Sequence, residues 1–328
     1  MRTALSVRSS FIAHRGLKMN KRLISILLST CATILCCATV GCNTPKKEHS
    51  WKNNYTYNDQ EHWLECEHCD EKKNLAEHLF TSSTCEICGA ALSPTEGLVY
   101  QLSDDNTYAT LIEYNGEATN VVIAPTYNGV PVREINEYAF LDGNKLTNIV
   151  IPDSVQTIGR FAFSGCSSLT KLFIPHSVTE MGESMLLNCS NLTELTLPFI
   201  GAKIDQEENS HIGYFFDCDS ESHQTNVPTS LKKVTITKST FIGDYAFRYC
   251  TSLTEIVIPR TVTHIGFGAF YACDALTSIF IPNSVVMINN YAFAYCYDIT
   301  IYCELESQPS AWDPRWNYDF PVVWGYKE

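Results

Sequence analysis

A period of 23 residues constrains the fold of this 328-residue chain more than any other feature. Bulky apolar residues mark the period on both sides of one interruption: Phe140, Phe163, Leu186, Phe247, Phe270 and Phe293. A unit of this length cannot bury its own apolar side chains, so neighbouring units must stack and share one core. The period therefore predicts a solenoid.

Each repeat combines a strand with a turn. The phrase Leu-x-x-Ile-x-Ile-Pro, as at 276–282, alternates with the period of a β-strand, and the proline ends it. In the phrase Ile-Gly-x-x-Ala-Phe-x-x-Cys, as at 158–166, the Gly is Asn in two copies, and both residue types predict a tight turn with positive φ. We expect Ala-Phe-x-x-Cys to form a short helical turn whose Phe fills the interior. The predicted fold is a β-rich solenoid with a parallel sheet and short helical turns.

The combined phrase resembles the repeat of the BspA-like leucine-rich repeat family of bacterial surface proteins. The resemblance covers roughly residues 100–328. It implies a leucine-rich-repeat solenoid with a lead-in or N-terminal cap at 91–134, repeats at 135–304, a loop insertion at 201–230 and a C-terminal cap at 305–328. It also implies a place at the cell surface, where some members of this family act as adhesins.

Residues 1–41 have the pattern of a secretory signal peptide. Two basic residues precede a run of apolar and small residues from 23 to 40, and the whole segment holds six basic residues and no acidic one. Because Met19 opens a conventional signal, residues 1–18 are interpreted as an over-long start. A transit peptide is the alternative interpretation.

The signal ends in Val40-Gly41-Cys42, which resembles the bacterial lipobox, where the cysteine is acylated and becomes the new N-terminus. Thr39 departs from that pattern, so ordinary signal-peptidase cleavage or an uncleaved anchor remains an alternative. With lipid on Cys42, two or three acyl chains would hold the protein stably at a bilayer. Residues 42–61, polar and without an apolar period, are predicted to be a tether.

Residues 62–90 carry two C-x2-C pairs, Cys66 with Cys69 and Cys85 with Cys88, separated by 15 residues. This spacing is typical of a zinc ribbon, in which four thiolates hold a structural zinc ion in a closed tetrahedral site. So short a segment buries little apolar surface, so a metal would supply its stability. Two disulfides are the alternative in an exported protein, and exchange of one ligand for a nearby histidine stays open.

Five further cysteines occupy one position of the repeat: Cys166, Cys189, Cys250, Cys273 and Cys296. The array needs a small residue there, and a free cysteine behaves as a small buried apolar residue. We interpret these cysteines as core residues rather than as disulfides or catalytic thiols. Cys218 and Cys303 are left without a predicted role.

The net charge and the lack of catalytic motifs limit the functions that this chain is expected to have. Beyond residue 41 the chain has 17 basic and 36 acidic residues, a formal charge of −19. Such an acidic surface argues against nucleic acid or an anionic membrane surface as the main partner. The carboxylates are scattered, and the sequence contains no familiar nucleophile or phosphate-binding motif, so we predict a protein that is not an enzyme.

The candidate binding surface is the outward side of the predicted strands. Phe173, Val257 and Phe280 occupy one outward column, and Lys171 and Glu194 occupy the neighbouring one. Exposed aromatic residues among polar ones mark interaction sites, although β-propensity alone would also favour such residues there. The prediction is a lipid-anchored surface protein that binds a protein or a glycan. An envelope-associated hydrolase or enzyme accessory protein with a site in the insertion, and a purely structural envelope component, are the alternatives.

Overall fold

The computed structural model describes residues 93–207, 209–218 and 226–327, together with three short strands nearer the N-terminus. The predicted lipidation site Cys42 lies outside the described residues, as do the four predicted zinc ligands Cys66, Cys69, Cys85 and Cys88. Within the described part of the chain, no helix is long and apolar enough to cross a membrane.

The three N-terminal strands are β1 (Thr56–Tyr57), β2 (Glu61–Glu65) and β3 (Lys72–Glu77), and they form an antiparallel sheet in that order. At the end of the β2–β3 hairpin, Glu65 pairs with Lys72. In the sequence, the first C-x2-C pair, at 66–69, follows β2 and precedes β3.

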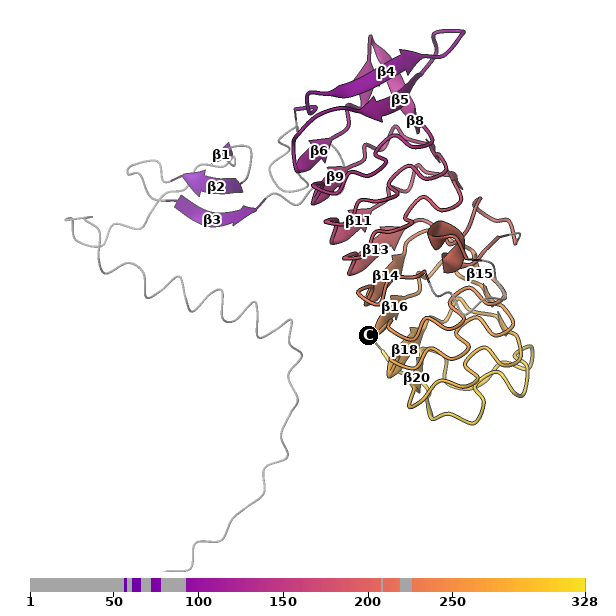
Figure 1. Ribbon diagram of the computed structural model, residues 1–328. Helices are drawn as coiled ribbons and strands as arrows, with labels where there is room; N and C mark the ends of the chain where they lie inside the picture. Colours follow the sequence, from indigo (N-terminus) through magenta and orange to yellow (C-terminus); the bar gives the residue numbers. More distant parts are fainter. Residues whose placement is uncertain are drawn as a thin grey trace, which may run out of the picture. The chain divides into compact units, whose positions relative to one another are not determined.

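The main ladder of the solenoid contains one strand from each coil, stacked along one side of the array (Figure 1). Its strands are β6 (Asn120–Val122), β9 (Asn148–Val150), β11 (Lys171–Phe173), β13 (Glu194–Leu197), β14 (Lys233–Ile236), β16 (Glu255–Val257), β18 (Ser278–Ile281), β20 (Thr300–Cys303) and β21 (Val322–Val323). Paired neighbours are parallel, as Leu195 shows by lying opposite Leu172 on one side and Val234 on the other. These three inward residues are buried, which confirms the predicted alternation.

A second, shorter ladder precedes the turns. It has one part made of β8 (Val130–Ile135), β10 (Thr157–Ile158) and β12 (Glu180–Met181), and another made of β15 (Phe241–Ile242), β17 (His264–Ile265) and β19 (Met287–Ile288). Ile158 lies opposite Met181, and Ile265 lies opposite Ile288. In each pair the two residues are one repeat apart in the sequence. The strands of neighbouring repeats therefore pair in the register that the sequence period predicts.

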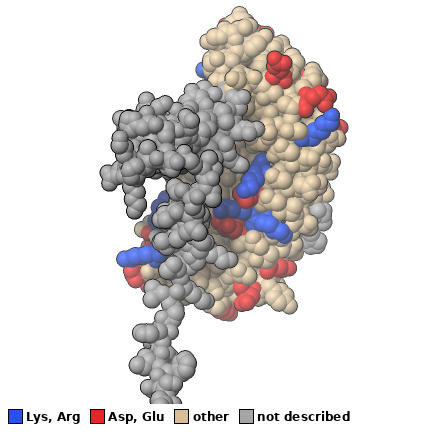
Figure 2. Space-filling view, turned by 90° about the vertical axis from the view of Figure 1, so that its left-hand side faces the viewer, with Lys and Arg blue, Asp and Glu red and all other residues tan. Residues whose placement is uncertain are grey.

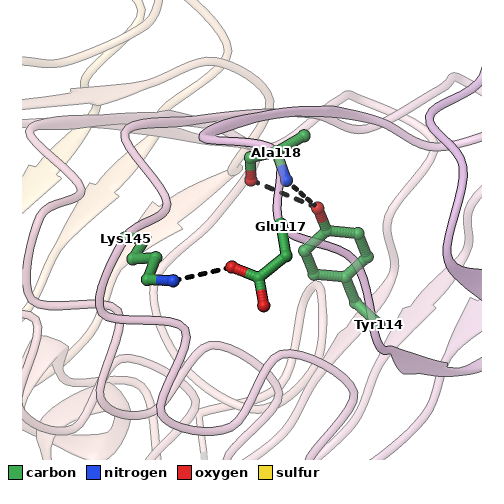
Figure 3. A network of polar contacts seen from close by, with 4 residues as sticks. All are labelled: Tyr114, Glu117, Ala118 and Lys145. Carbon is green, nitrogen blue, oxygen red and sulfur yellow. Dashed lines mark hydrogen bonds and ion pairs between the residues drawn. The ribbon is translucent and has the colours of Figure 1, made fainter.

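A hairpin forms the N-terminal end of the array. Its strands β4 (Leu98–Leu102) and β5 (Ala109–Tyr114) are antiparallel, and β5 pairs in parallel with β8, which also pairs with β7 (Thr126–Tyr127). Figure 3 shows two contacts of the segment that follows the hairpin. The Ala118 amide donates a hydrogen bond to the hydroxyl of Tyr114, the last residue of β5, at 2.8 Å. Glu117 Oε2 in the same segment lies 2.6 Å from Lys145 Nζ.

The prediction of a helical turn in each repeat is wrong. The Ser164 amide donates to the Phe161 carbonyl at 3.0 Å, and the Cys166 amide donates to the Phe163 carbonyl at 3.1 Å. These are the bonds of successive β-turns. Phe161 and Gly165 have φ of 54° and 78°, and left-handed residues so close together interrupt any helix. Within the described residues the only helix is the 3-10 helix η1 (Ile212–Phe216).

The prediction of positive φ at the glycine after the repeat's Ile is also wrong. Neither Gly159 nor Gly182 has a positive φ; the left-handed residue comes two positions later, at Phe161 in the second copy. A Cβ on Gly182 would lie 2.3 Å from the Arg160 amide nitrogen, which belongs to the preceding coil. Glycine is needed there because the backbones of neighbouring coils approach closely.

Stacked aromatic rings fill the interior beneath the turns. The ring centroids of Phe247 and Phe270 are 5.6 Å apart, and those of Phe270 and Phe293 are 5.0 Å apart. Trp316 packs edge-on against this row with its ring centroid 5.8 Å from that of Phe293, and Trp312 packs edge-on against Trp316 at 4.8 Å. Both tryptophans are buried, so the last repeat does not expose its apolar interior.

Part of the 201–230 insertion is built into this core. Ile212, Phe215 and Phe216 of η1 are fully buried. The Leu186 amide donates to the Phe215 carbonyl at 2.9 Å, and the Ile212 amide donates to the Ala246 carbonyl at 2.9 Å. The segment therefore supplies a turn layer between two coils, whereas the sequence predicts a loop that bulges from the solenoid.

Candidate functional site

The outward residues of the main ladder form the surface that we call the sheet face. Strand register places Phe173 beside Thr196, Thr196 beside Thr235, and Thr235 beside Val257. Phe173 is half-buried, and so is Phe280 in β18, while Val257 is exposed. The structure thus brings Phe173 and Val257 into one column, with threonines between them.

Charged residues on the sheet face are paired with one another. Lys171 Nζ lies 2.8 Å from Glu194 Oε1, and Lys233 Nζ lies 2.7 Å from Glu255 Oε1 on the next two strands. In Figure 2, basic side chains lie next to acidic ones on this face. Cross-strand ion pairs at a surface contribute little to stability. Because opposite charges are paired, the sheet face has no strong electrostatic potential of either sign.

The two predicted aromatic anchors differ in their surroundings. The ring of Phe280 lies 6.1 Å from that of Tyr326, and the Arg260 guanidinium lies 5.9 Å from its centre. Tyr326 also packs on Tyr302 at 4.8 Å. The C-terminal residues therefore occupy part of the space over Phe280.

The repeat cysteines are buried, as predicted, and they are free thiols. The thiols of Cys166, Cys189, Cys273 and Cys296 donate to the carbonyl of the repeat Phe in the preceding coil, at 3.4, 3.2, 3.0 and 3.1 Å. Burial raises the pKa of Cys166 to about 12 and that of Cys296 to about 11. A thiol that stays protonated at neutral pH is a poor nucleophile, so we interpret these side chains as small core residues.

An open groove of about 1370 Å³ lies between the insertion and the second part of the short ladder. Polar residues of both regions and of the turn after β12 line it, among them Glu183, Glu207, Asp217, Asp244, Thr263 and His264. This groove could not be predicted from the sequence, because it depends on how η1 packs between two coils. The only sequence signal for it was the polar composition of the insertion.

Three of the groove's carboxylates are held by contacts within the solenoid. Glu183 pairs with Arg160 at 3.2 Å, the Ser184 hydroxyl donates to Asp217 at 3.1 Å, and the Phe267 amide donates to Asp244 at 2.6 Å. These contacts connect neighbouring coils and the insertion, which is a structural role. In the described residues, no group of three or more His, Cys, Asp and Glu side chains could hold a metal ion.

Comparison with known proteins gives one family match. The model described as "BspA type Leucine rich repeat region" matches six copies of its repeat, at residues 119–220 and 224–307. These two segments include the main ladder from β6 to β20 and the groove. No curated protein matches the chain.

Several solved structures are similar to this chain. A T. pallidum leucine rich repeat protein is 25% identical, with 65% of this chain and 82% of that chain covered and a TM-score of 0.39. A leucine rich cell surface protein from Faecalibacterium prausnitzii A2-165 is 28% identical, with 66% and 56% covered and a TM-score of 0.43. A leucine-rich repeat protein from Eubacterium ventriosum is 23% identical, with 70% and 60% covered and a TM-score of 0.45. Since all three TM-scores are below 0.5, the repeat match carries the assignment to a family.

Proposed function

Because this chain belongs to the BspA-type leucine rich repeat family, we propose that it is a bacterial cell-surface protein whose sheet face binds a protein or a glycan. The column that contains Phe173 and Val257 carries the proposal. Solenoids use such a continuous row of outward side chains to contact partners along several repeats. Because the charges on this face pair with each other, recognition there rests on shape and on the apolar side chains rather than on long-range attraction.

The N-terminal segments extend this proposal. Acylation of Cys42 would anchor the protein at the membrane surface, and the tether would let the solenoid reach outward. Zinc held by Cys66, Cys69, Cys85 and Cys88 would stabilise the small sheet of β1, β2 and β3. The pairing of β2 with β3 supports the zinc proposal, because it places side by side the two strands that flank the first C-x2-C pair in the sequence.

Metal analysis and thiol counting on the purified chain test the zinc proposal together. We expect about one zinc ion per chain, released by a chelator along with the appearance of four reactive thiols. Disulfides would instead give less than about half a zinc ion per chain and no free thiol at these four cysteines.

Two substitutions on the sheet face test the binding proposal. Phe173→Thr and Val257→Thr introduce a residue that Thr196 and Thr235 already place in the same column, so the strands should still form. Purified extracellular-matrix proteins, surface glycans and envelope fractions serve as probes. We expect the double variant to bind its partner about tenfold more weakly, with thermal unfolding unchanged.

The matched control is Val286→Thr, because Val286 is an exposed apolar residue outside the main ladder. It should leave partner binding intact. Undiminished binding by the sheet-face variant would place the partner elsewhere on the solenoid. A large loss of stability in that variant would instead show that the two residues are part of the core.

A further inference from the structure

Seven aromatic rings form a connected layer on the turn side of the last coils, and we call this surface the tyrosine face. Its members are Tyr245, Tyr249, Phe267, Tyr271, Tyr291, Tyr295 and Tyr318. Successive ring centroids are 4.9 to 6.2 Å apart. None of the seven is buried, and Tyr295 is 57% exposed.

Two arginines hold the rings in place. The Arg248 guanidinium lies 4.8 Å from the ring centres of both Tyr245 and Tyr249 and 5.4 Å from that of Tyr271. Arg315 lies 5.0 Å from the ring of Tyr291 and donates to its hydroxyl at 3.0 Å. Cation–π contacts of this kind fix rings in one orientation before any ligand arrives.

The fold does not require tyrosine at these positions. Tyr249 and Tyr295 have φ of 58° and 60°, a conformation that is unfavourable for a bulky residue. In the first three copies the same left-handed position holds residues that suit it better: Asp142, Gly165 and Asn188. Large side chains that are kept at strained backbone positions, clustered and not buried, point to a function rather than to folding.

The tyrosine face continues into the groove. Tyr245 belongs to both, and the groove beside it offers hydrogen-bonding groups such as Asp244, Thr263 and His264. Among the described residues that line the groove, none is a lysine or an arginine, whereas four are carboxylates. A ligand for this combined surface must present apolar faces to the rings and many hydroxyl groups to the groove, and it must not carry negative charge into it.

We propose that the tyrosine face and the adjoining groove bind a neutral oligosaccharide. The C–H face of a sugar ring packs on the electron-rich face of a tyrosine ring, and sugar hydroxyls donate to carboxylate oxygens. Single-stranded nucleic acid also stacks on aromatic rings, but it needs a cationic groove for its phosphates. The carboxylates of the groove likewise disfavour acidic glycans. This site is separate from the sheet face and does not depend on the function proposed for it.

Titration calorimetry with the purified chain tests the proposal, using cellohexaose, chitohexaose and mannohexaose as neutral probes and a hyaluronan hexasaccharide as the acidic one. We expect at least one neutral probe to bind at submillimolar concentration and the acidic probe not to bind. The double variant Tyr249→Asn, Tyr295→Asn should weaken that binding at least about tenfold. It should keep its unfolding temperature, because Asn188 fills the equivalent position in the third copy.

Two controls keep the outcome clear. Tyr138→Asn removes an exposed ring at the other end of the array, where Tyr138 stacks on Phe161 at 5.3 Å, and it should leave sugar binding unchanged. If the double variant does not fold, Tyr318→Asn alone tests the same surface from the C-terminal segment. Binding of the acidic probe in preference, no binding of any neutral probe, or full binding by the tyrosine variants would overturn the proposal. Loss of sugar binding in the Phe173→Thr, Val257→Thr variant would move the site to the sheet face.

Discussion

The sheet face and the tyrosine face show two ways in which one solenoid presents side chains to solvent. On the sheet face, parallel strands hold threonine, valine and phenylalanine in a column and pair lysines with glutamates. On the tyrosine face, β-turns hold rings at left-handed positions over a buried layer of phenylalanines. The residues of the sheet face are types that β-strands favour. Several residues of the tyrosine face, in contrast, have a left-handed backbone conformation that is unfavourable for bulky side chains.

This difference separates the residues that stabilise the array from those that can bind a ligand. Inside the coil, a ring such as Phe270 is fully buried, and one position further along, Tyr271 is half-buried on the tyrosine face. Substitutions on the two sides of this boundary should therefore have very different effects on folding.

The largest effect is expected from Phe270→Ala. Phe270 is fully buried between Phe247 and Phe293, so the change leaves a cavity and should lower the free energy of unfolding by about 3–5 kcal/mol. Tyr271→Ala removes a ring of similar size from the tyrosine face and should cost no more than about 1.5 kcal/mol. Urea denaturation of both variants measures the contrast, and equal losses would show that the tyrosine face is part of the core.

An intermediate effect is expected where the coils touch. Gly182→Ala would place a Cβ against the backbone of the preceding coil, so it should destabilise the chain by about 1–3 kcal/mol. Asn289→Ala, at the same repeat position in the sixth copy, should change stability by less than about 0.5 kcal/mol, because a side chain is already accommodated there. Similar values for both variants would mean that the coils can move apart at little cost.

The same two positions show how far the sequence could predict this fold. The 23-residue period predicted the strands, their parallel order and the inward residues, because each follows from stacking identical units. The role of Gly182 was not predictable, since a close approach between coils is a contact across one repeat and leaves no local mark. The turn type was missed because its left-handed positions hold Phe161 and Tyr249 as well as Gly165.

The candidate sites were predicted less completely than the fold. Strand register alone places Phe173 and Val257 on one face, so the repeat pattern was enough to predict the column of the sheet face that contains them. The groove could not, because it depends on η1 filling a layer between Leu186 and Ala246. The tyrosine face could have been predicted from the sequence. Tyr249 and Tyr295 occupy the repeat position that holds Asp142 in the first copy, and an alignment of the copies would show this change.

Alkaline pH should destabilise the folded chain. Burial raises the pKa of Cys166 and Cys303 to about 12, from an ordinary value of 9.0. Above about pH 9 the unfolded chain loses thiol protons that the folded chain keeps, so the free energy of unfolding should fall as pH rises from about 9 towards 12. Urea denaturation at several pH values measures this decline, and Cys166→Ala should make it shallower. An equal decline in that variant would assign the effect to other groups.

The smallest effect is expected on the sheet face, from the ion pair between Lys233 and Glu255. A double-mutant cycle with Lys233→Ala and Glu255→Ala should give a coupling energy of about 0.2–1 kcal/mol that shrinks as salt is added. Both side chains are partly exposed, so water and ions compete with the pair. A coupling well above this range would mean that the charged column holds the strands in register. A coupling near zero would mean that this pair does not contribute to the stability of the strands.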